Sequence, residues 1–123
     1  MNRSRHVAPV ALGAAALLLA GCALVSVSQR EETRMGRDYS SQLNEELPLV
    51  DDTAIRGYVN RVGTDIASRT DRPNLPYEFQ VVNTDVVNAF AVPGGFIYMN
   101  RGLLEASEDM SEVAGVLAHE VAH

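Results

Sequence analysis

The last five residues of the chain follow the pattern H-E-x-x-H, with His119 and His123 at its ends and Glu120 after the first histidine. On an α-helix, residues four apart point within about 40° of each other and lie roughly 6 Å apart along the axis, so both imidazole rings can reach one ion. Zinc binds imidazole nitrogen, and its catalytic sites keep one position for water. Glu120 is placed to accept a proton from that water. The pattern therefore predicts a zinc hydrolase with His119 and His123 as ligands and Glu120 as general base.

Two other interpretations of this pattern stay open. Two solvent-facing histidines at the end of a helix would suit the helix dipole without any metal. The same pair could also belong to a structural metal site, because two ligands alone do not show whether a fourth coordination position is open for catalysis. The pattern lies on a predicted helix with an apolar opposite face, and this context favours the catalytic interpretation.

The helix that carries the pattern is predicted to begin at Asp109. Asp109 with Glu112 three residues later resembles a capping box, although serine or threonine is the usual cap. The apolar residues of this helix then continue to the end of the chain; they are Val113, Val116, Leu117 and Val121.

An earlier helix is predicted from Glu31 to Leu47. Its apolar residues Met35, Tyr39 and Leu43 recur every four residues, and Pro48 ends the run.

A second helix is predicted after an N-cap at Asp51 or Asp52. Gly57 and Gly63 interrupt it and are expected to mark close packing, and a loop from Arg69 to Pro76 follows. Its apolar face consists of Ile55, Tyr58, Val59, Val62 and Ile66.

Three short strands are predicted between these helices. Tyr77 to Asn83 alternates in part between apolar and polar residues, which is typical of a strand with one buried face. Ala89 to Val92 and Phe96 to Asn100 flank Pro93-Gly94-Gly95, whose proline and glycines favour a hairpin turn. A helical turn is predicted from Gly102 to Ala106.

The first thirty residues resemble a secretory leader. Residues 1–6 carry two arginines, residues 7–20 are uncharged and rich in alanine and leucine, and Leu19-Ala20-Gly21-Cys22 resembles a bacterial lipobox. We therefore expect residues 1–21 to be a lipoprotein signal peptide, Cys22 to be lipidated, and residues 22–30 to form a tether. Ala23 after the cysteine favours sorting to the outer membrane, facing the periplasm. The alternative is an uncleaved transmembrane helix from Val7 to Val27.

The charge and cysteine content exclude several classes of protein. Sixteen acidic and ten basic residues give a formal net charge of −6, and the chain has no basic stretch in its globular part, so we expect no nucleic-acid partner. One cysteine excludes an internal disulfide framework and a cysteine-rich zinc site.

Three segments occur together in a fixed order: Asn88-Ala89-Phe90-Ala91-Val92-Pro93-Gly94-Gly95, Asn100-Arg101-Gly102-Leu103-Leu104, and Glu112 to His123. In this order they resemble the M48 zinc metallopeptidases, which include HtpX-like, Oma-like, BepA-like and LoiP-like proteases. With the lipobox, the chain looks most like the LoiP-like lipoprotein members. The resemblance extends over residues 31–123.

The resemblance implies a gluzincin-type α+β fold, with helices packed on a small β-sheet and the active-site helix last. It implies Zn²⁺ as cofactor, held by His119 and His123. It also implies that the strand from Asn88 to Val92 borders the cleft, where an edge strand can hold an extended peptide by main-chain hydrogen bonds. The candidate substrate-binding residues are therefore Asn88, Ala89, Phe90 and Ala91. Phe90 and Val92 could equally be core residues, and Asn88 could merely cap the strand.

Family members take a third metal ligand, a glutamate, from a later helix, and no residue of this sequence replaces it. Glu112 lies roughly 10.5 Å back along the helix axis, while Glu105 and Glu108 precede the helix. We therefore expect residues 31–123 to be the N-terminal part of a metallopeptidase domain, truncated after the H-E-x-x-H pattern and inactive as a protease alone.

The predicted function of the full-length protein is that of a membrane-anchored zinc endopeptidase in the bacterial envelope. Its substrates would be misfolded or misassembled envelope proteins, a class that comes from the resemblance only. The other expected partners are the membrane, through lipid on Cys22, and the outer-membrane assembly machinery. The alternative is a non-catalytic lipoprotein that binds unfolded β-strands by edge pairing.

Overall fold

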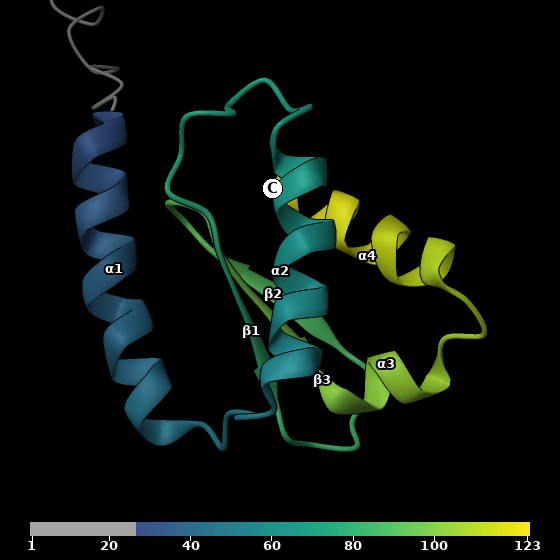
Figure 1. Cartoon of the computed structure of the whole chain (residues 1–123). Helices are drawn as coiled ribbons and strands as arrows, with labels where there is room; N and C mark the ends of the chain where they lie inside the picture. Colours follow the sequence, from purple (N-terminus) through teal and green to yellow (C-terminus); the bar gives the residue numbers. More distant parts are fainter. Residues whose placement is uncertain (1–26) are drawn as a thin grey trace, which may run out of the picture.

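The structure, a computed structural model, describes residues 27–123. The predicted signal peptide, the lipidation site Cys22 and most of the predicted tether lie outside the described residues. Within the described part, no helix has the length and apolar character needed to cross a membrane. The elements follow the order α1 (Gln29–Glu46), α2 (Thr53–Ala67), β1 (Glu78–Val82), β2 (Ala89–Val92), β3 (Phe96–Asn100), α3 (Arg101–Ala106) and α4 (Met110–Ala122) (Figure 1).

The three strands form one mixed sheet in the order β1-β3-β2. β2 and β3 form the predicted antiparallel hairpin, and β1 lies parallel to β3 on its other side. Ile97 in β3 pairs with Phe79 of β1 and with Ala91 of β2, so these three residues form one row across the sheet. The central strand β3 is buried at every position, while β2 is an edge strand.

The hairpin turn depends on two glycines. Gly94 has a φ of 101° and Gly95 a φ of 99°, in the left-handed region that side chains with a Cβ rarely adopt. The predicted turn at Pro93-Gly94-Gly95 is therefore confirmed.

The core has two parts, one on each face of the sheet. On one face, α2 and α4 pack against alternate residues of β1 and β3, including Phe79, Ile97 and Met99. On the other face, α1 covers Phe96 and Tyr98, with Leu43 and Leu47 packed against them. This is the predicted α+β arrangement of helices on a small sheet, with α1 separated from α2 and α4 by the strands (Figure 1).

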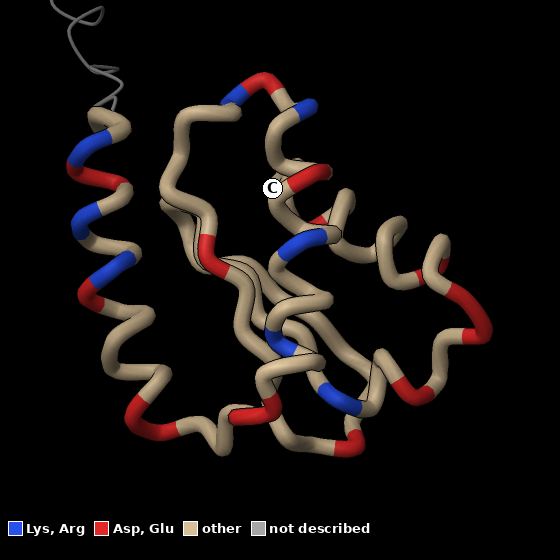
Figure 2. The backbone as a smooth tube through the Cα atoms, viewed as in Figure 1, with Lys and Arg blue, Asp and Glu red and all other residues tan. Residues whose placement is uncertain are grey.

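The predicted apolar face of α1 is confirmed at Leu43, which packs against the core, and is wrong at its other two residues. Met35 and Tyr39 are 51% and 55% exposed, and the residues that α1 buries are instead Gly36 and Ser40. The physical reason is that α1 lies against the hairpin turn too closely for a large side chain. Met35 and Tyr39 therefore lie on the exposed side of α1, and acidic and basic residues recur along the length of this helix (Figure 2).

A buried hydrogen-bond cluster joins α1 to the sheet. The Tyr98 hydroxyl lies 2.5 Å from Ser40 Oγ and donates to Asn44 Oδ1 at 2.9 Å. Desolvation by burial raises the pKa of Tyr98, although the Ser40 hydrogen bond opposes this effect. Ser40 and Asn44 thus supply polar partners for a phenol that would otherwise be buried without one.

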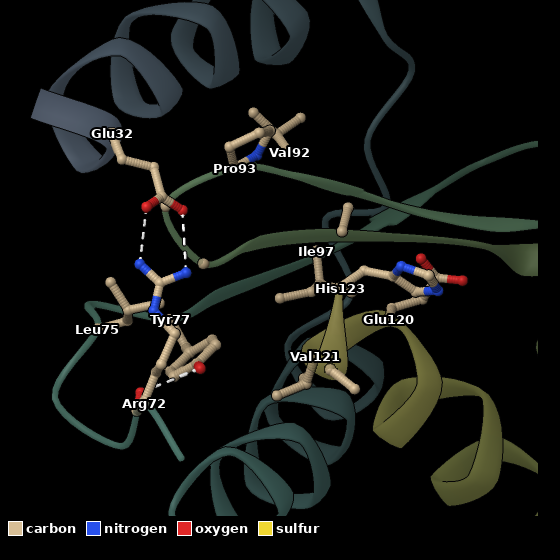
Figure 3. A pocket seen from close by; sticks show the side chains of 14 residues that line it. Glu32, Arg72, Leu75, Tyr77, Val92, Pro93, Ile97, Glu120, Val121 and His123 are labelled. Carbon is tan, nitrogen blue, oxygen red and sulfur yellow. Dashed lines mark hydrogen bonds and ion pairs between the residues drawn. The ribbon is translucent and has the colours of Figure 1, made fainter. Parts of the chain in front are cut away.

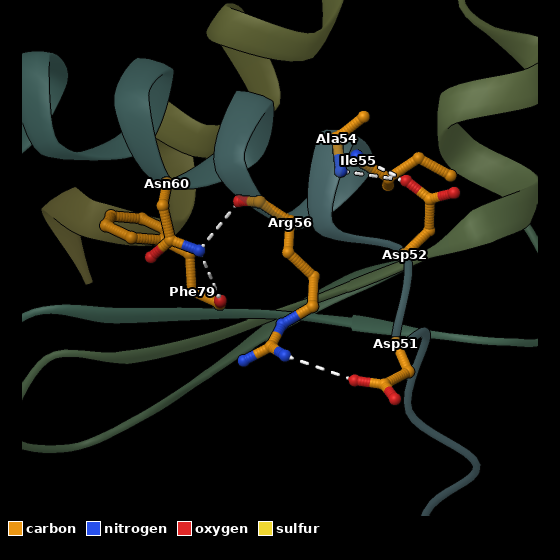
Figure 4. Close-up of polar contacts among 7 residues, drawn as sticks. All are labelled: Asp51, Asp52, Ala54, Ile55, Arg56, Asn60 and Phe79. Atoms are coloured by element: carbon orange, nitrogen blue, oxygen red, sulfur yellow. Dashed lines mark hydrogen bonds and ion pairs between the residues drawn. The ribbon is translucent and has the colours of Figure 1, made fainter.

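Helix α2 is capped by Asp52, so Asp52 rather than Asp51 is the N-cap. Asp52 accepts hydrogen bonds from the backbone N–H groups of Ala54 and Ile55, whereas Asp51 forms an exposed ion pair with Arg56 (Figure 4).

Two contacts attach α2 to β1. Asn60 Nδ2 donates to the carbonyl oxygens of Arg56 and Phe79 (Figure 4). A Cβ added at Gly63 would stand 2.5 Å from the Phe79 ring, so the expected close packing is confirmed there. Only the end of the Arg61 side chain would lie within 4 Å of a Cβ added at Gly57, so the expectation of close packing is wrong at this position.

Candidate active site

The N-terminus of α4 is capped by Asp109, as predicted. Its carboxylate accepts from the backbone N–H groups of Ser111 at 2.8 Å and Glu112 at 3.2 Å, and also from the Ser111 hydroxyl. The Ser111 hydroxyl and these two N–H groups lower the pKa of Asp109. The Glu112 carboxylate accepts from the N–H of Glu108 at 2.8 Å. Asp109 therefore caps the helix as expected, and only the return bond is displaced by one residue, because the Glu112 carboxylate accepts from Glu108 rather than from Asp109.

Packing decides which side of α4 faces outward. Val113, Leu117 and Val121 are buried in the core that α4 shares with α2 and the sheet. His119 and His123 are exposed, and Glu120 is half-buried between the two environments. Because the buried residues recur at spacings of four, the helix cannot rotate without exposing them. The histidine pair therefore has a defined orientation.

The two histidine side chains converge. Their Nε2 atoms lie 3.1 Å apart, with ring centroids 4.6 Å apart and ring planes at 71°. Two zinc ligands at about 2.0–2.1 Å from the ion and at a tetrahedral angle stand about 3.3–3.4 Å apart. The observed separation is close to this value, so the pair fits two positions of one zinc ion.

The site lacks a third protein ligand among residues 27–123. No group of three or more histidine, cysteine, aspartate or glutamate side chains in this part of the chain is arranged to hold a metal ion. The structure therefore does not bring Glu105, Glu108 or Glu112 to the histidine pair.

A pocket of about 120 Å³ adjoins the end of α4, and we call it the hairpin pocket. Glu120 and His123 line one side of it, while Ala91, Val92 and Ile97 of the hairpin line another (Figure 3). The predicted general base and the second predicted ligand thus share a cavity with the edge strand.

The four predicted substrate-binding residues lie in different places relative to the hairpin pocket. Ala91 lies at the hairpin pocket with Glu120. Phe90 points to the opposite face of the sheet, where its ring stacks on Tyr98 with centroids 4.9 Å apart. Asn88 is exposed, and its carbonyl oxygen accepts from the N–H of Asn100, which extends the hairpin ladder by one step. Ala89 packs against the same core as Ala91.

Four other pocket residues come from regions without any functional signal in the sequence. Glu32 lies in α1, and Arg72, Leu75 and Tyr77 lie in and after the loop that follows α2. No local pattern links them, because Glu32 and Arg72 are 40 residues apart along the chain.

Comparison with known proteins bears on both the fold and the site. The family model described as peptidase family M48 matches residues 54–123, which is more than half of the chain. The chain is 34% identical over 98 residues to the beta-barrel assembly-enhancing protease of Escherichia coli (strain K12), and 35% identical over 98 residues to that of Yersinia pestis. Each alignment covers 80% of this chain and 20% of the relative.

A mitochondrial relative is similar over a comparable share of the chain. The mitochondrial metalloendopeptidase OMA1 of Schizosaccharomyces pombe is 33% identical over 102 residues, covering 79% of this chain and 30% of the relative. The chain thus spans about a fifth of the length of the bacterial relatives it matches.

Proposed function

Because the chain belongs to peptidase family M48, we propose that it carries the metal-binding helix and the substrate-binding strand of a zinc-dependent endopeptidase. The observation that supports this most is the 3.1 Å separation of the His119 and His123 Nε2 atoms, with Glu120 beside them. Helical spacing brings the two rings to the same side of α4, and the 3.1 Å separation leaves both Nε2 atoms in position to bind one ion.

Each residue of the site has a distinct role in this proposal. The two histidines bind through Nε2, so each ring carries its proton on Nδ1. Zinc, when bound, acts as a Lewis acid that acidifies water and polarises a carbonyl group. The Glu120 carboxylate accepts a proton from the attacking water and delivers it to the amide nitrogen as the peptide bond breaks. A third protein ligand would come from outside the described residues.

The edge strand β2 would hold the substrate. β2 pairs only with β3 among the described strands, so its other edge can accept main-chain hydrogen bonds from an extended peptide. Ala91 places this edge next to the pocket that Glu120 and His123 line. Asn88, Ala89 and Phe90 would support the strand, with Phe90 acting through its packing on Tyr98.

We also propose a bacterial envelope setting. The bacterial relatives are named for enhancing β-barrel assembly, so the substrates would be misfolded or misassembled envelope proteins, and the assembly machinery would be a partner. Lipid on Cys22 would anchor the protein to the outer membrane, facing the periplasm. Mass spectrometry of the mature N-terminus tests the anchor: an unmodified Cys22 with residues 1–21 still attached would contradict it.

The central experiment compares Glu120→Gln with the unmodified protein in a form that supplies the third metal ligand, because this chain alone is expected to be inactive. Zinc content and cleavage of an unfolded protein are both measured. Glu120→Gln should keep the metal and abolish cleavage, because only the proton acceptor is lost. Cleavage that survives this substitution would show that the assigned base is wrong.

A non-catalytic role is the second candidate, supported by the free edge of β2 and the incomplete ligand set. A lipoprotein of this kind would bind unfolded β-strands by edge pairing, without metal. It predicts that peptide binding is unaffected when His119 and His123 are both replaced by alanine, and that no form of the protein cleaves peptides.

A further inference from the structure

The hairpin pocket has two chemically different ends. Glu120 and His123 lie at one end, and the opposite end is closed by Glu32 and Arg72 (Figure 3). Ile97 lies between them, and it is buried. The pocket therefore leads from the candidate catalytic groups, past an aliphatic surface, to an ion pair.

The ion pair is bidentate. Arg72 Nη1 donates to Glu32 Oε1 at 3.1 Å, and Nη2 donates to Oε2 at 2.7 Å. The Tyr77 hydroxyl donates to the carbonyl oxygen of Arg72 at 3.1 Å and so helps to hold the backbone there (Figure 3). Because the two charges compensate each other, the closed end presents little net charge to a group in the pocket.

The size of the pocket limits what enters it. A cavity of about 150 Å³ lined by aliphatic and aromatic residues is large enough for benzene. The hairpin pocket, at about 120 Å³, is smaller. A branched aliphatic side chain such as that of valine or leucine matches this volume better than the larger indole ring does.

We propose that the hairpin pocket binds one side chain of a peptide lying along β2, and that the Glu32–Arg72 pair makes it select an uncharged, branched aliphatic side chain. This inference rests on the proposed function in placing the peptide on β2 and the bond to be cleaved beside Glu120. Because the pocket adjoins Glu120, the selected residue lies within one or two positions of the bond to be cleaved.

The ion pair gives the proposal a sharp test, since each partner masks the charge of the other. Glu32→Gln leaves the Arg72 guanidinium uncompensated, so peptides with glutamate at the selected position should gain affinity. Arg72→Gln leaves the Glu32 carboxylate uncompensated, so peptides with lysine at the selected position should gain affinity. Both groups are partly exposed to solvent, so each gain should be up to about five-fold. Loss of a purely structural ion pair would not shift the two preferences in opposite directions.

The experiment measures binding of fluorescein-labelled extended peptides to the metal-free chain by fluorescence anisotropy. A valine, leucine, tryptophan, glutamate or lysine is moved through each position of an otherwise constant peptide. We expect one position at which valine and leucine bind several-fold more tightly than the other three. Equal binding of tryptophan, no preference at any position, or no binding would overturn the proposal.

Two controls separate selectivity from stability. Glu31→Gln, one residue away, breaks an exposed pair with Arg34 that does not line the pocket, and it should leave the preference unchanged. If either single variant unfolds, as judged by circular dichroism, the charge-reversed double variant Glu32→Arg with Arg72→Glu should restore both folding and the aliphatic preference. A folded double variant without that preference would contradict the proposal.

The outcomes also separate this inference from the proposed function. Selective binding without cleavage by any zinc-loaded form would contradict the protease and leave the pocket assignment standing. Cleavage whose rate does not depend on any substrate side chain near the bond would contradict the pocket assignment and leave the protease standing.

Discussion

The backbone of Gly36 in α1 lies directly against the carbonyl group of Pro93 at the hairpin turn. A Cβ added at Gly36 would stand 1.8 Å from the Pro93 oxygen and 3.1 Å from the Phe96 ring. This contact sets how closely α1 approaches the sheet. It also brings Glu32, one helical turn earlier, to the ion pair at the end of the hairpin pocket.

We therefore expect Gly36→Ala to destabilise the protein. Either α1 or the turn must move to admit the methyl group, which should lower the free energy of unfolding by about 2 to 3 kcal/mol. Urea denaturation measures this. Gly115→Ala in α4 is the matched control, because nothing lies within 4 Å of the added Cβ, and it should raise stability by up to about 1 kcal/mol. Equal effects at both positions would contradict the close approach.

Replacing either histidine of the pair should weaken zinc binding. His119→Ala and His123→Ala each remove one of the two convergent Nε2 atoms, so we expect a loss of affinity of at least about ten-fold, measured by competition with a chelator. Glu108→Gln, which changes an acidic side chain that does not reach the histidine pair, should have no effect. Retention of full affinity in both site variants would mean that the metal binds elsewhere.

The stability of the protein should fall at alkaline pH because of Tyr98. Burial raises the pKa of this phenol above its ordinary value of 10.0, so the native state keeps the proton at a pH where the unfolded chain has lost it. Stability is unaffected below pH 10.0, declines as pH rises above it, and stops declining above the folded pKa. Denaturation between pH 9 and 11 should show this decline. Tyr98→Phe should reduce it and lower stability at neutral pH by about 1 to 2 kcal/mol.

The ion pair at the pocket should contribute to acid sensitivity. Hydrogen bonds from Arg72 hold the pKa of Glu32 below its ordinary value of 4.5, although partial desolvation opposes them. The contribution is complete above pH 4.5 and is lost as pH falls through the folded pKa. Glu32→Gln should make stability less dependent on pH below 4.5, by at most about 1 kcal/mol because the pair is partly exposed. Part of the dependence should remain, since the pKa of Asp109 is lowered as well. An unchanged acid profile would show that the pair is weak in solution.

Features that depend on near neighbours were predictable from the sequence. The cap at Asp109, the glycine turn of the hairpin and the four-residue spacing of the histidines each involve residues within a few positions. Their geometry follows from backbone conformation and helical repeat. The family resemblance over residues 88–123 reflects the same concentration of local patterns in this region.

The misassigned face of α1 shows where such reasoning fails. Met35, Tyr39 and Leu43 recur as a buried stripe would, yet the first two are exposed. The helix instead turns its small residues, Gly36 and Ser40, toward the sheet. Close contact with a turn some 57 residues later outweighed the burial of two large side chains, and helical periodicity contains no information about that turn.

By itself, the sequence determined that a helix ends in two convergent imidazoles with a carboxylate between them, because a helix repeats every 3.6 residues whatever surrounds it. Only the tertiary structure decided which elements enclose that carboxylate. The parallel pairing of β1 with β3 and the joining of Glu32 to Arg72 depend on contacts between distant segments. Such contacts are selected by the packing of the whole domain rather than by the conformational preferences of any one segment.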